Sequence, residues 1–179
     1  MIRLFAGLAL PDDVAGRLAS MAAGIPGARW VEARNLHVTL RFVGEVEDGL
    51  ARDVHDSLAE AALGPAVGLS VTGFGTFGSR QPHALWAAVD KTPELARLQA
   101  KVESAVVRAG LDPEPRKFTP HVTLARLKDT RVGRVQDFIA AHSPLTLGPA
   151  VIDHVTLFRS HLGRTGAEYE AVAEYPLGP

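Results

Sequence analysis

The tetrapeptide His-Val-Thr-Leu occurs three times in this chain of 179 residues, beginning at His37, His121 and His154. On a β-strand, the side chains of residues i and i+2 point to the same face, about 6.5 to 7 Å apart. At that spacing an imidazole and a hydroxyl can contact different oxygens of one phosphate group. His37 with Thr39, and His121 with Thr123, are therefore candidate phosphate-binding pairs.

Two histidines that face one groove would supply an acid and a base near neutral pH, because the unperturbed pKa of imidazole is about 6.5. One ring would take a proton from water or a hydroxyl group, and the other would give a proton to the departing oxygen. Hydroxyl and cationic donors would stabilise charge on the phosphate. This pattern favours phosphodiester cleavage without a metal ion.

A zinc site made of His37, His121 and His154 is the chemical alternative. Ligands from one strand would more naturally read His-x-His, and no carboxylate occupies a comparable position. In the third copy, Ile152 and Phe158 lie an even number of residues from His154 and so on the same face of a strand. This face is therefore more apolar than the corresponding face of either other copy. We interpret His154 as a structural, partly buried histidine.

Composition bounds the class of protein. The chain is 46% hydrophobic and 22% charged with a net charge of −1, which indicates one soluble globular domain or two small lobes that share a core. Residues 1–10 are apolar, but they are too few to span a bilayer and lack the flanks of a secretory signal, so a buried first strand is expected. The absence of cysteine excludes disulfides and thiolate chemistry and fits a cytoplasmic protein.

Basic residues are concentrated in one stretch, although the net charge argues against a broad surface for coating nucleic acid. Six basic residues and one acid lie between positions 116 and 134. This excess predicts a local anionic ligand, and a solvated surface is the alternative. The residues are Arg116, Lys117, Arg126, Lys128, Arg131 and Arg134, with Asp129 as the acid.

Strand and helix patterns alternate along the chain. The third predicted helix is the clearest, with Thr92 as N-cap, Pro93 in its first turn and Gly110 at its end. We predict an α+β fold of mostly antiparallel sheets covered on one side by helices, with the His-Val-Thr-Leu strand recurring once per half. Predicted helices are 11–24, 46–63, 92–110 and 131–142; predicted strands are 2–10, 28–31, 36–44, 67–77, 83–90, 117–127, 150–162 and 168–177.

The segments "NLHVTLRFVGEV" and "FTPHVTLARL" resemble the paired His-x-Thr signatures of the two-histidine (2H) phosphoesterase superfamily. Their flanks are similar to its LigT/ThpR branch, the RNA 2′,3′-cyclic phosphodiesterases first described as 2′-5′ RNA ligases. The segments "IRLFAGLALP", "HALWAAVD" and "LFRSHLGRTGAEYEAVAEYPL" follow in the order of that branch. The resemblance implies one bilobal domain over residues 1–179, with pseudo-two-fold duplicated lobes around a central catalytic groove.

The resemblance also implies a reaction: hydrolysis of RNA 2′,3′-cyclic phosphate ends to 2′-phosphate, without metal or cofactor. His37 would be the proton donor and His121 the proton acceptor, with Thr39, Thr123 and Arg126 binding the substrate. The acids after His37 and the basic run after His121 are compatible with these roles. The third copy lies where this family has no catalytic histidine. The protein is expected to be a cytoplasmic monomer that acts on RNA and has no membrane partner.

Three points stay open in the sequence. Ligation in the reverse direction and a non-catalytic module that binds RNA ends are alternative functions. Arg126 lies an odd number of residues after His121, so it shares the face of that ring only if a bulge interrupts the strand. Phe5, Phe42 and Phe118 could stack on a base, but aromatic side chains in such strands more often pack in the core.

Overall fold

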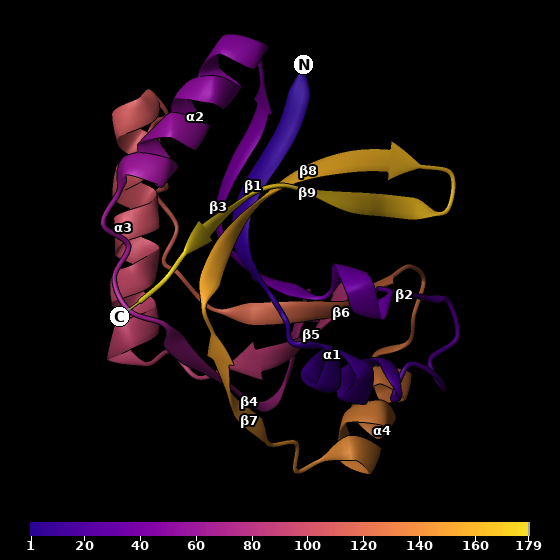
Figure 1. Ribbon diagram of the computed structural model, residues 1–179. Helices are drawn as coiled ribbons and strands as arrows, with labels where there is room; N and C mark the ends of the chain where they lie inside the picture. Colours follow the sequence, from indigo (N-terminus) through magenta and orange to yellow (C-terminus); the bar gives the residue numbers. More distant parts are fainter. Residues whose placement is uncertain (179) are drawn as a thin grey trace.

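The structure is a computed structural model that describes residues 1–178, and it confirms the α+β class. Its strands and helices follow the alternation that the sequence predicts (Figure 1). The elements are β1 (Ile2–Ala9), α1 (Asp12–Ala19), β2 (Ala28–Trp30), η1 (Ala33–Asn35), β3 (His37–Val46), α2 (Asp48–Glu60), β4 (Val67–Phe77), β5 (Ala84–Val89), α3 (Pro93–Ala109), β6 (His121–Leu127), α4 (Val132–His142), β7 (Leu147–Ile152), β8 (His154–Gly163) and β9 (Gly166–Pro176).

The strands form a curled antiparallel sheet in the order β7-β4-β5-β6-β3-β1-β8-β9, with β2 added to the edge of β6. One lobe contains β1, β3, β8 and β9, and the other contains β4, β5, β6 and β7. The lobes meet where β3 and β6 pair at a single position, Val38 with Val122. The bilobal arrangement that the sequence predicts is therefore present, and its junction lies within the two motifs.

Helices α2 and α3 pack against each other and cover one face of the sheet, where α3 contacts β3 and β4 (Figure 1). The caps of α3 agree with the prediction: Thr92 Oγ1 accepts a hydrogen bond of 3.1 Å from Leu95 N, and Gly110 ends the helix with a φ of 123°. Helix α1 lies against η1 and β7. The motif strands thus have a helix-covered face and an opposite face that is free for a site.

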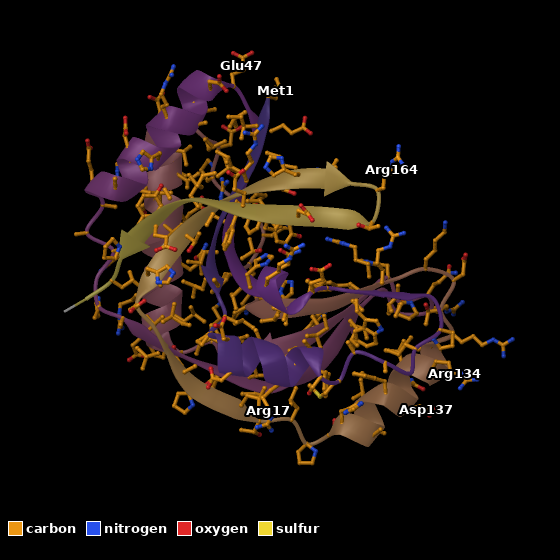
Figure 2. All side chains as sticks on the ribbon, turned by 45° about the vertical axis from the view of Figure 1, so that its right-hand side comes forward. Met1, Arg17, Glu47, Arg134, Asp137 and Arg164 are labelled. Atoms are coloured by element: carbon orange, nitrogen blue, oxygen red, sulfur yellow. The ribbon has the colours of Figure 1, made fainter. Side chains whose placement is uncertain are left out.

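The hydrophobic core lies between the sheet and its helices, and buried residues of α1, α2, α3 and α4 all belong to it. Leu8 of β1, Leu58 of α2, Leu85 of β5 and Val102 of α3 are all fully buried. Figure 2 shows that charged side chains such as Arg17, Glu47, Arg134, Asp137 and Arg164 project outward from the ribbon, and all of them are exposed. The expected buried first strand is confirmed as β1. No helix among residues 1–178 is long and apolar enough to cross a bilayer.

One predicted strand is wrong. The sequence pattern suggested a single strand over 150–162, whereas the structure contains two strands that are separated at Asp153. The reason is that the chain changes lobe at this point: β7 pairs with β4, and β8 pairs with β1. A second difference is smaller: the predicted strand 117–127 begins only at His121, directly after Pro120, whose nitrogen cannot donate to a ladder.

Candidate functional site

The four polar side chains of the first two motifs lie together on the sheet face that the core does not use. Val38 and Val122 form the antiparallel pair between β3 and β6, and both are completely buried. In this register His37 lies across from Thr123, and Thr39 lies across from His121. All four are half-buried, in contrast to the buried valines between them. The tertiary structure thus brings the two His-x-Thr pairs side by side on one face of the sheet.

Each motif strand contains a β-bulge at the residue after its threonine. The extra residue is Leu40 in β3 and Leu124 in β6, at equivalent positions of the two motifs. A bulge reverses the alternation of side chains beyond it. The register pairs that define the bulges are Gly7–Thr39 followed by Ala6–Arg41, and Trp86–Thr123 followed by Leu85–Ala125.

The bulges carry the side chains five residues after each histidine onto the groove face. Over seven residues, β3 and β6 show the same order of half-buried, buried and exposed positions, with Phe42 and Arg126 as the exposed ones. The bulge that the sequence required for Arg126 is therefore present. The core position that the sequence favoured for Phe42 is wrong, because 52% of this residue is exposed. Phe5 is buried, with 3% exposed, but its ring packs against His37 and Phe158 and not in the main hydrophobic cluster.

Both histidine rings are held in the same way by the backbone. The Nδ1 atom of His37 lies 2.7 Å from the carbonyl oxygen of Asn35, and that of His121 lies 2.8 Å from the carbonyl oxygen of Thr119. Since a carbonyl oxygen can only accept, Nδ1 carries the hydrogen in both rings. Each Nε2 is then available for proton transfer, and that of His37 lies 3.0 Å from Thr39 Oγ1.

Aromatic rings surround each histidine at similar angles. Tyr169 meets His37 edge-on at 5.1 Å and 89°, and Phe77 meets His121 edge-on at 5.2 Å and 88°. The ring of Trp86 also lies 5.6 Å from that of His121. The approximate two-fold relation between the lobes thus extends from the backbone to the side chains that enclose the site.

The protonation of His37 is strongly affected by this environment. Burial beside Phe5 and Phe158, whose centroids lie 4.7 and 5.8 Å from the imidazole centroid, lowers the pKa of His37 from 6.5 to about 4. The hydrogen bond to Asn35 acts in the opposite direction, and the charge of His121 lowers the pKa of His37 further. The ring is neutral at pH 7 in the unliganded protein. The acids that follow His37 in sequence do not contribute to this shift.

Two cavities are lined by side chains of the motif strands. One of about 280 Å³ is lined by Thr39 and His121 together with Phe42, Phe77 and Lys117. The other, of about 130 Å³, is lined by Asn35, Arg126 and Tyr169 among other residues. The basic stretch of the sequence is therefore divided, because Arg116 and Lys117 line the first cavity and Arg126 lines the second. Lys128, Arg131 and Arg134 line neither.

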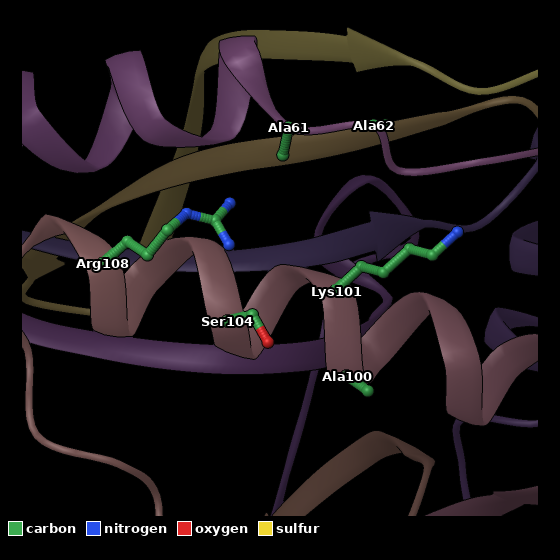
Figure 3. A pocket seen from close by; sticks show the side chains of 6 residues that line it. All are labelled: Ala61, Ala62, Ala100, Lys101, Ser104 and Arg108. Carbon is green, nitrogen blue, oxygen red and sulfur yellow. The ribbon is translucent and has the colours of Figure 1, made fainter.

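A further cavity of about 320 Å³ lies away from the motif strands, between the end of α2 and α3 (Figure 3). Lys101, Ser104 and Arg108 project from α3 beside it, and small side chains complete its walls. It contains no histidine that could act as a base for Ser104. This cavity therefore lacks the paired histidines of the motif strands.

The third motif copy has different surroundings. His154 Nδ1 lies 2.7 Å from Asp153 Oδ1, and its Nε2 lies 3.8 Å from Glu174 Oε1, so acids hold this ring. Within residues 1–178, no group of three or more His, Cys, Asp or Glu side chains could hold a metal ion. The three-histidine zinc site that the sequence left open is therefore not formed. That His154 takes no part in catalysis stays a prediction.

Several contributors to the site had no signal in the sequence. Asn35 and Thr119 act through backbone carbonyls, which every residue has. Tyr169 reaches His37 from β9, far along the chain. Phe77 and Trp86 belong to predicted strands, but alternation alone does not show which aromatic side chains face a histidine on another strand.

Comparisons with known proteins agree with this architecture. Residues 10–164 match the model of the 2′-5′ RNA ligase superfamily. A protein of Aeropyrum pernix named RNA 2′,3′-cyclic phosphodiesterase is 31% identical over 167 residues, which are 89% of this chain and 94% of that protein. A protein of the same name from Bacillus subtilis is 30% identical and covers 97% of this chain, with 95% of its own length matched.

Solved structures show the same fold. The apo form of Escherichia coli LigT superposes with a TM-score of 0.79 over 99% of this chain and 98% of that one, at 24% sequence identity. Its complex with 3′-AMP gives a TM-score of 0.77. Because the family model covers most of the residues, including both His-x-Thr strands that pair at Val38 and Val122, this chain belongs to the 2′-5′ RNA ligase superfamily.

Proposed function

We propose that this protein is an enzyme that hydrolyses RNA 2′,3′-cyclic phosphate ends to 2′-phosphates, with His37 and His121 as its two proton carriers. The observation that carries the proposal is the pairing of β3 and β6 at Val38 and Val122. It places two imidazoles on one face, each with Nδ1 bound to a backbone carbonyl and Nε2 left for proton transfer. The names of the similar proteins support the choice of substrate.

The reaction assigns a task to each ring. Water attacks phosphorus on the side opposite to O3′, a new P–O bond forms, and the P–O3′ bond breaks. His121 Nε2 takes the proton of the water, and His37 Nε2 gives a proton to O3′, which leaves a 2′-phosphate monoester. Thr39, Thr123 and Arg126 donate hydrogen bonds to the phosphate oxygens. No step needs a metal ion or a cofactor.

The donor role requires His37 to gain a proton when the substrate binds, because its pKa is about 4 in the unliganded protein. An anionic phosphate in the groove favours the charged imidazolium, and this raises the pKa of His37. The hydrogen bond from Nδ1 to Asn35 also stabilises the charged ring. The assignment of donor and acceptor is thus a specific part of the proposal with its own test.

The proposed unit is the whole chain, residues 1–179, acting as a monomer in the cytoplasm without a membrane partner. Each lobe supplies one histidine, so neither lobe alone could carry out the reaction. One chain supplies both proton carriers and the substrate-binding groups, so the proposed chemistry requires no second subunit.

Ligation is the second candidate, and the name of the superfamily favours it. In that direction a 5′-hydroxyl replaces water as the nucleophile and a 2′-5′ linkage forms. The same base and acid serve both reactions, because each replaces the P–O3′ bond by a bond to the nucleophile's oxygen, which belongs to water in hydrolysis and to the 5′-hydroxyl in ligation.

The deciding experiment is incubation with an oligonucleotide that ends in a 2′,3′-cyclic phosphate, with and without a second oligonucleotide that carries a 5′-hydroxyl. We expect a terminal 2′-phosphate as the main product in both cases. A 3′-phosphate would contradict the assignment of the leaving oxygen, and a 2′-5′ joined product would favour ligation. Binding without turnover would contradict the proposal and favour a module that binds RNA ends.

A further inference from the structure

The segment that leads into β6 contains neither helix nor strand. It comprises residues 111–120, and several of these are prolines, whose nitrogen cannot donate a hydrogen bond. The carbonyl oxygen of Thr119 in this segment nevertheless holds Nδ1 of His121 at 2.8 Å. The orientation of the His121 ring therefore depends on what fixes an irregular piece of chain.

The corresponding segment before β3 is fixed by its own backbone. Asn35, whose carbonyl oxygen holds His37, donates from its backbone N–H to Glu32 at 2.9 Å as part of the η1 turn. Among residues 1–178, no backbone–backbone hydrogen bond involves residues 112–119. Within that range Phe118 is the residue that packs against the core. The polar backbone before β6 must therefore be held in another way.

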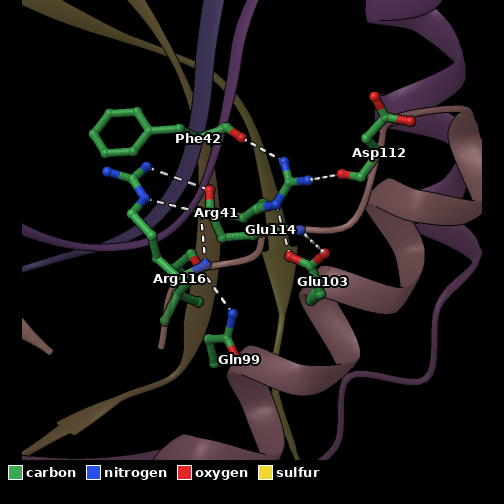
Figure 4. A network of polar contacts seen from close by, with 8 residues as sticks. Arg41, Phe42, Gln99, Glu103, Asp112, Glu114 and Arg116 are labelled. Carbon is green, nitrogen blue, oxygen red and sulfur yellow. Dashed lines mark hydrogen bonds and ion pairs between the residues drawn. The ribbon is translucent and has the colours of Figure 1, made fainter. Parts of the chain in front are cut away.

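A buried ion pair supplies this support. Arg41 of β3, which is 7% exposed, binds Glu103 of α3 at 2.6 Å and also donates to the carbonyl oxygen of Asp112. The other oxygen of Glu103 accepts a hydrogen bond of 3.0 Å from the backbone N–H of Glu114. Figure 4 shows the guanidinium between the carboxylate and the Asp112 carbonyl. Apart from the bond to the histidine, all hydrogen bonds in residues 1–178 that join the backbone of 112–119 to other elements go to this pair.

The β-bulge in β3 directs Arg41 to this place. On a regular strand its side chain would share the face of the histidine four residues earlier, but the bulge at Leu40 turns it to the side that α3 covers. Gln99 lies one helical turn before Glu103 and donates to the carbonyl oxygen of Leu40 at 3.2 Å. In β6 the residue equivalent to Arg41 is Ala125, which cannot form an ion pair. The support is therefore present on one motif strand and absent from the other.

Stability alone is a weak reason for such a pair. Apolar side chains of similar volume often stabilise a protein as well as a buried ion pair does, because the two charges lose their hydration. Apolar side chains would, however, bind neither the Asp112 carbonyl nor the Glu114 N–H. The property that only the charged pair provides is a fixed position of the segment.

We propose that Arg41 and Glu103 are positioning residues for His121. They hold residues 112–119 against β3, and this segment orients the imidazole through the Thr119 carbonyl oxygen. Because Arg41 and His37 belong to the same strand, the pair also links the two histidines by a route separate from the Val38–Val122 contact. The inference rests on the proposed function and deepens it, since it names what aligns the proton acceptor with the water that attacks phosphorus.

The first test separates positioning from stability. The double variant Arg41→Met/Glu103→Met replaces the pair by apolar side chains, whereas either single change would leave an unpaired buried charge and strongly destabilise the fold. We expect a urea midpoint near that of the parent and a kcat for a cyclic-phosphate oligonucleotide that is lower by about 10- to 100-fold. An unchanged kcat in the folded double variant would overturn the proposal.

A second variant serves if the double variant does not fold. Arg41→Lys keeps the charge that Glu103 requires, but a single ammonium cannot reproduce the fork that binds Glu103 and Asp112 together. It should lower kcat in the same direction by a smaller factor. Parent-like kcat in this variant would likewise count against positioning by the pair.

The second test observes the two rings directly by ¹⁵N and ¹³C NMR of labelled histidine, at a pH of about 8.5, where an ordinary imidazole is neutral. In the parent, both His37 and His121 should carry the ring hydrogen on Nδ1. In the double variant, His121 should show a mixture of both tautomers while His37 stays unchanged. An equal change in both rings, or a change in neither, would overturn the proposal.

A matched control removes another ion pair from the same helix. Glu94 and Arg97 of α3 lie 3.6 Å apart, and both are exposed. The variant Glu94→Gln/Arg97→Gln should therefore leave kcat and the tautomers of both rings unchanged. A loss of kcat as large as that of the Arg41/Glu103 double variant would show that any change of charge on α3 has this effect, and would contradict a specific role for the buried pair.

A failure of the proposed function is distinguishable from a failure of this inference. If the parent protein does not hydrolyse the oligonucleotide, the function fails, but the NMR comparison needs no turnover and still tests the pair. A change confined to His121 would then support the positioning role, and parent-like signals from this ring would overturn it.

Discussion

The two motif strands share one framework but differ in what surrounds each histidine. Both strands have a bulge after the threonine, a buried valine at the centre and a backbone carbonyl that holds Nδ1. The His37 ring is packed against Phe5 and Phe158 of its own lobe, and this burial lowers its pKa to about 4. The His121 ring borders the cavity that contains Phe42 and Phe77.

This difference shows how two lobes with the same backbone geometry can carry different side chains at equivalent positions. The backbone geometry is common to both halves, so the side chains five residues after the histidines occupy equivalent places. One of these is Phe42 and the other is Arg126. The two-fold arrangement of the His-x-Thr pairs is thus flanked by an apolar ring on one strand and a cation on the other.

The largest expected effect comes from removing either proton carrier. His37→Ala and His121→Ala should each lower turnover of a 2′,3′-cyclic phosphate by about 10²- to 10⁴-fold, because each loses one general acid or base step. Initial rates with a cyclic-phosphate oligonucleotide measure this, and circular dichroism checks the fold. Near-normal turnover by either variant would show that the two histidines do not act as a pair.

The second prediction separates the roles of the two rings. A substrate with a better leaving group at the 3′ position, such as a 3′-thio cyclic phosphorothiolate, needs less help from an acid. It should rescue His37→Ala substantially and His121→Ala hardly at all, because the former lacks the proton donor. Equal rescue, or rescue of the His121 variant alone, would reverse the assignment and leave the two-histidine mechanism in place.

The third prediction concerns the pH dependence of stability that follows from the burial of the His37 ring. The pKa of His37 is about 4 in the folded protein and near 6.5 when unfolded, so the unfolded chain binds more protons between these values. The contribution of neutral His37 to the free energy of unfolding is fully present above pH 6.5 and is lost as the pH falls towards 4. From the shift we expect a loss of about 2 to 3 kcal/mol.

Urea unfolding at several pH values, compared between the parent and His37→Gln, measures this contribution. The glutamine variant should lack that part of the pH dependence, because its side chain does not titrate. Glu114 and Asp153 have lowered pKa values and are retained in both proteins, so their effects cancel in the comparison. Parallel curves for the two proteins would mean that His37 is not desolvated as the structure indicates.

The smallest effect is expected at the third motif copy. His154→Gln should leave turnover within a few-fold of the parent, since the ring is bound by Asp153 and lies near Glu174. Rates with and without EDTA test this prediction. A loss as large as that of His37→Ala, together with restoration by zinc after EDTA treatment, would contradict the structural role and favour a metal site.

Much of the fold could be predicted from local patterns. The caps of α3, the apolar β1 and the strands that carry the motifs each depend on neighbouring residues, and these predictions are confirmed. The sequence did not predict that the strand over 150–162 is divided at Asp153. The chain changes its pairing partner there, and this change does not alter the alternation of apolar and polar residues. The same holds for Phe42, whose parity indicated the core until the bulge at Leu40 reversed it.

The sequence by itself determined the candidate reacting groups: two His-x-Thr pairs on separate strands, with an arginine five residues after the second histidine. These features depend on residue type and spacing along one strand. The tertiary structure decided how the pairs meet, which side chains the bulges expose and how strongly each ring is desolvated. These properties arise between segments far apart in the chain, because strand register and burial depend on partners that local spacing does not specify.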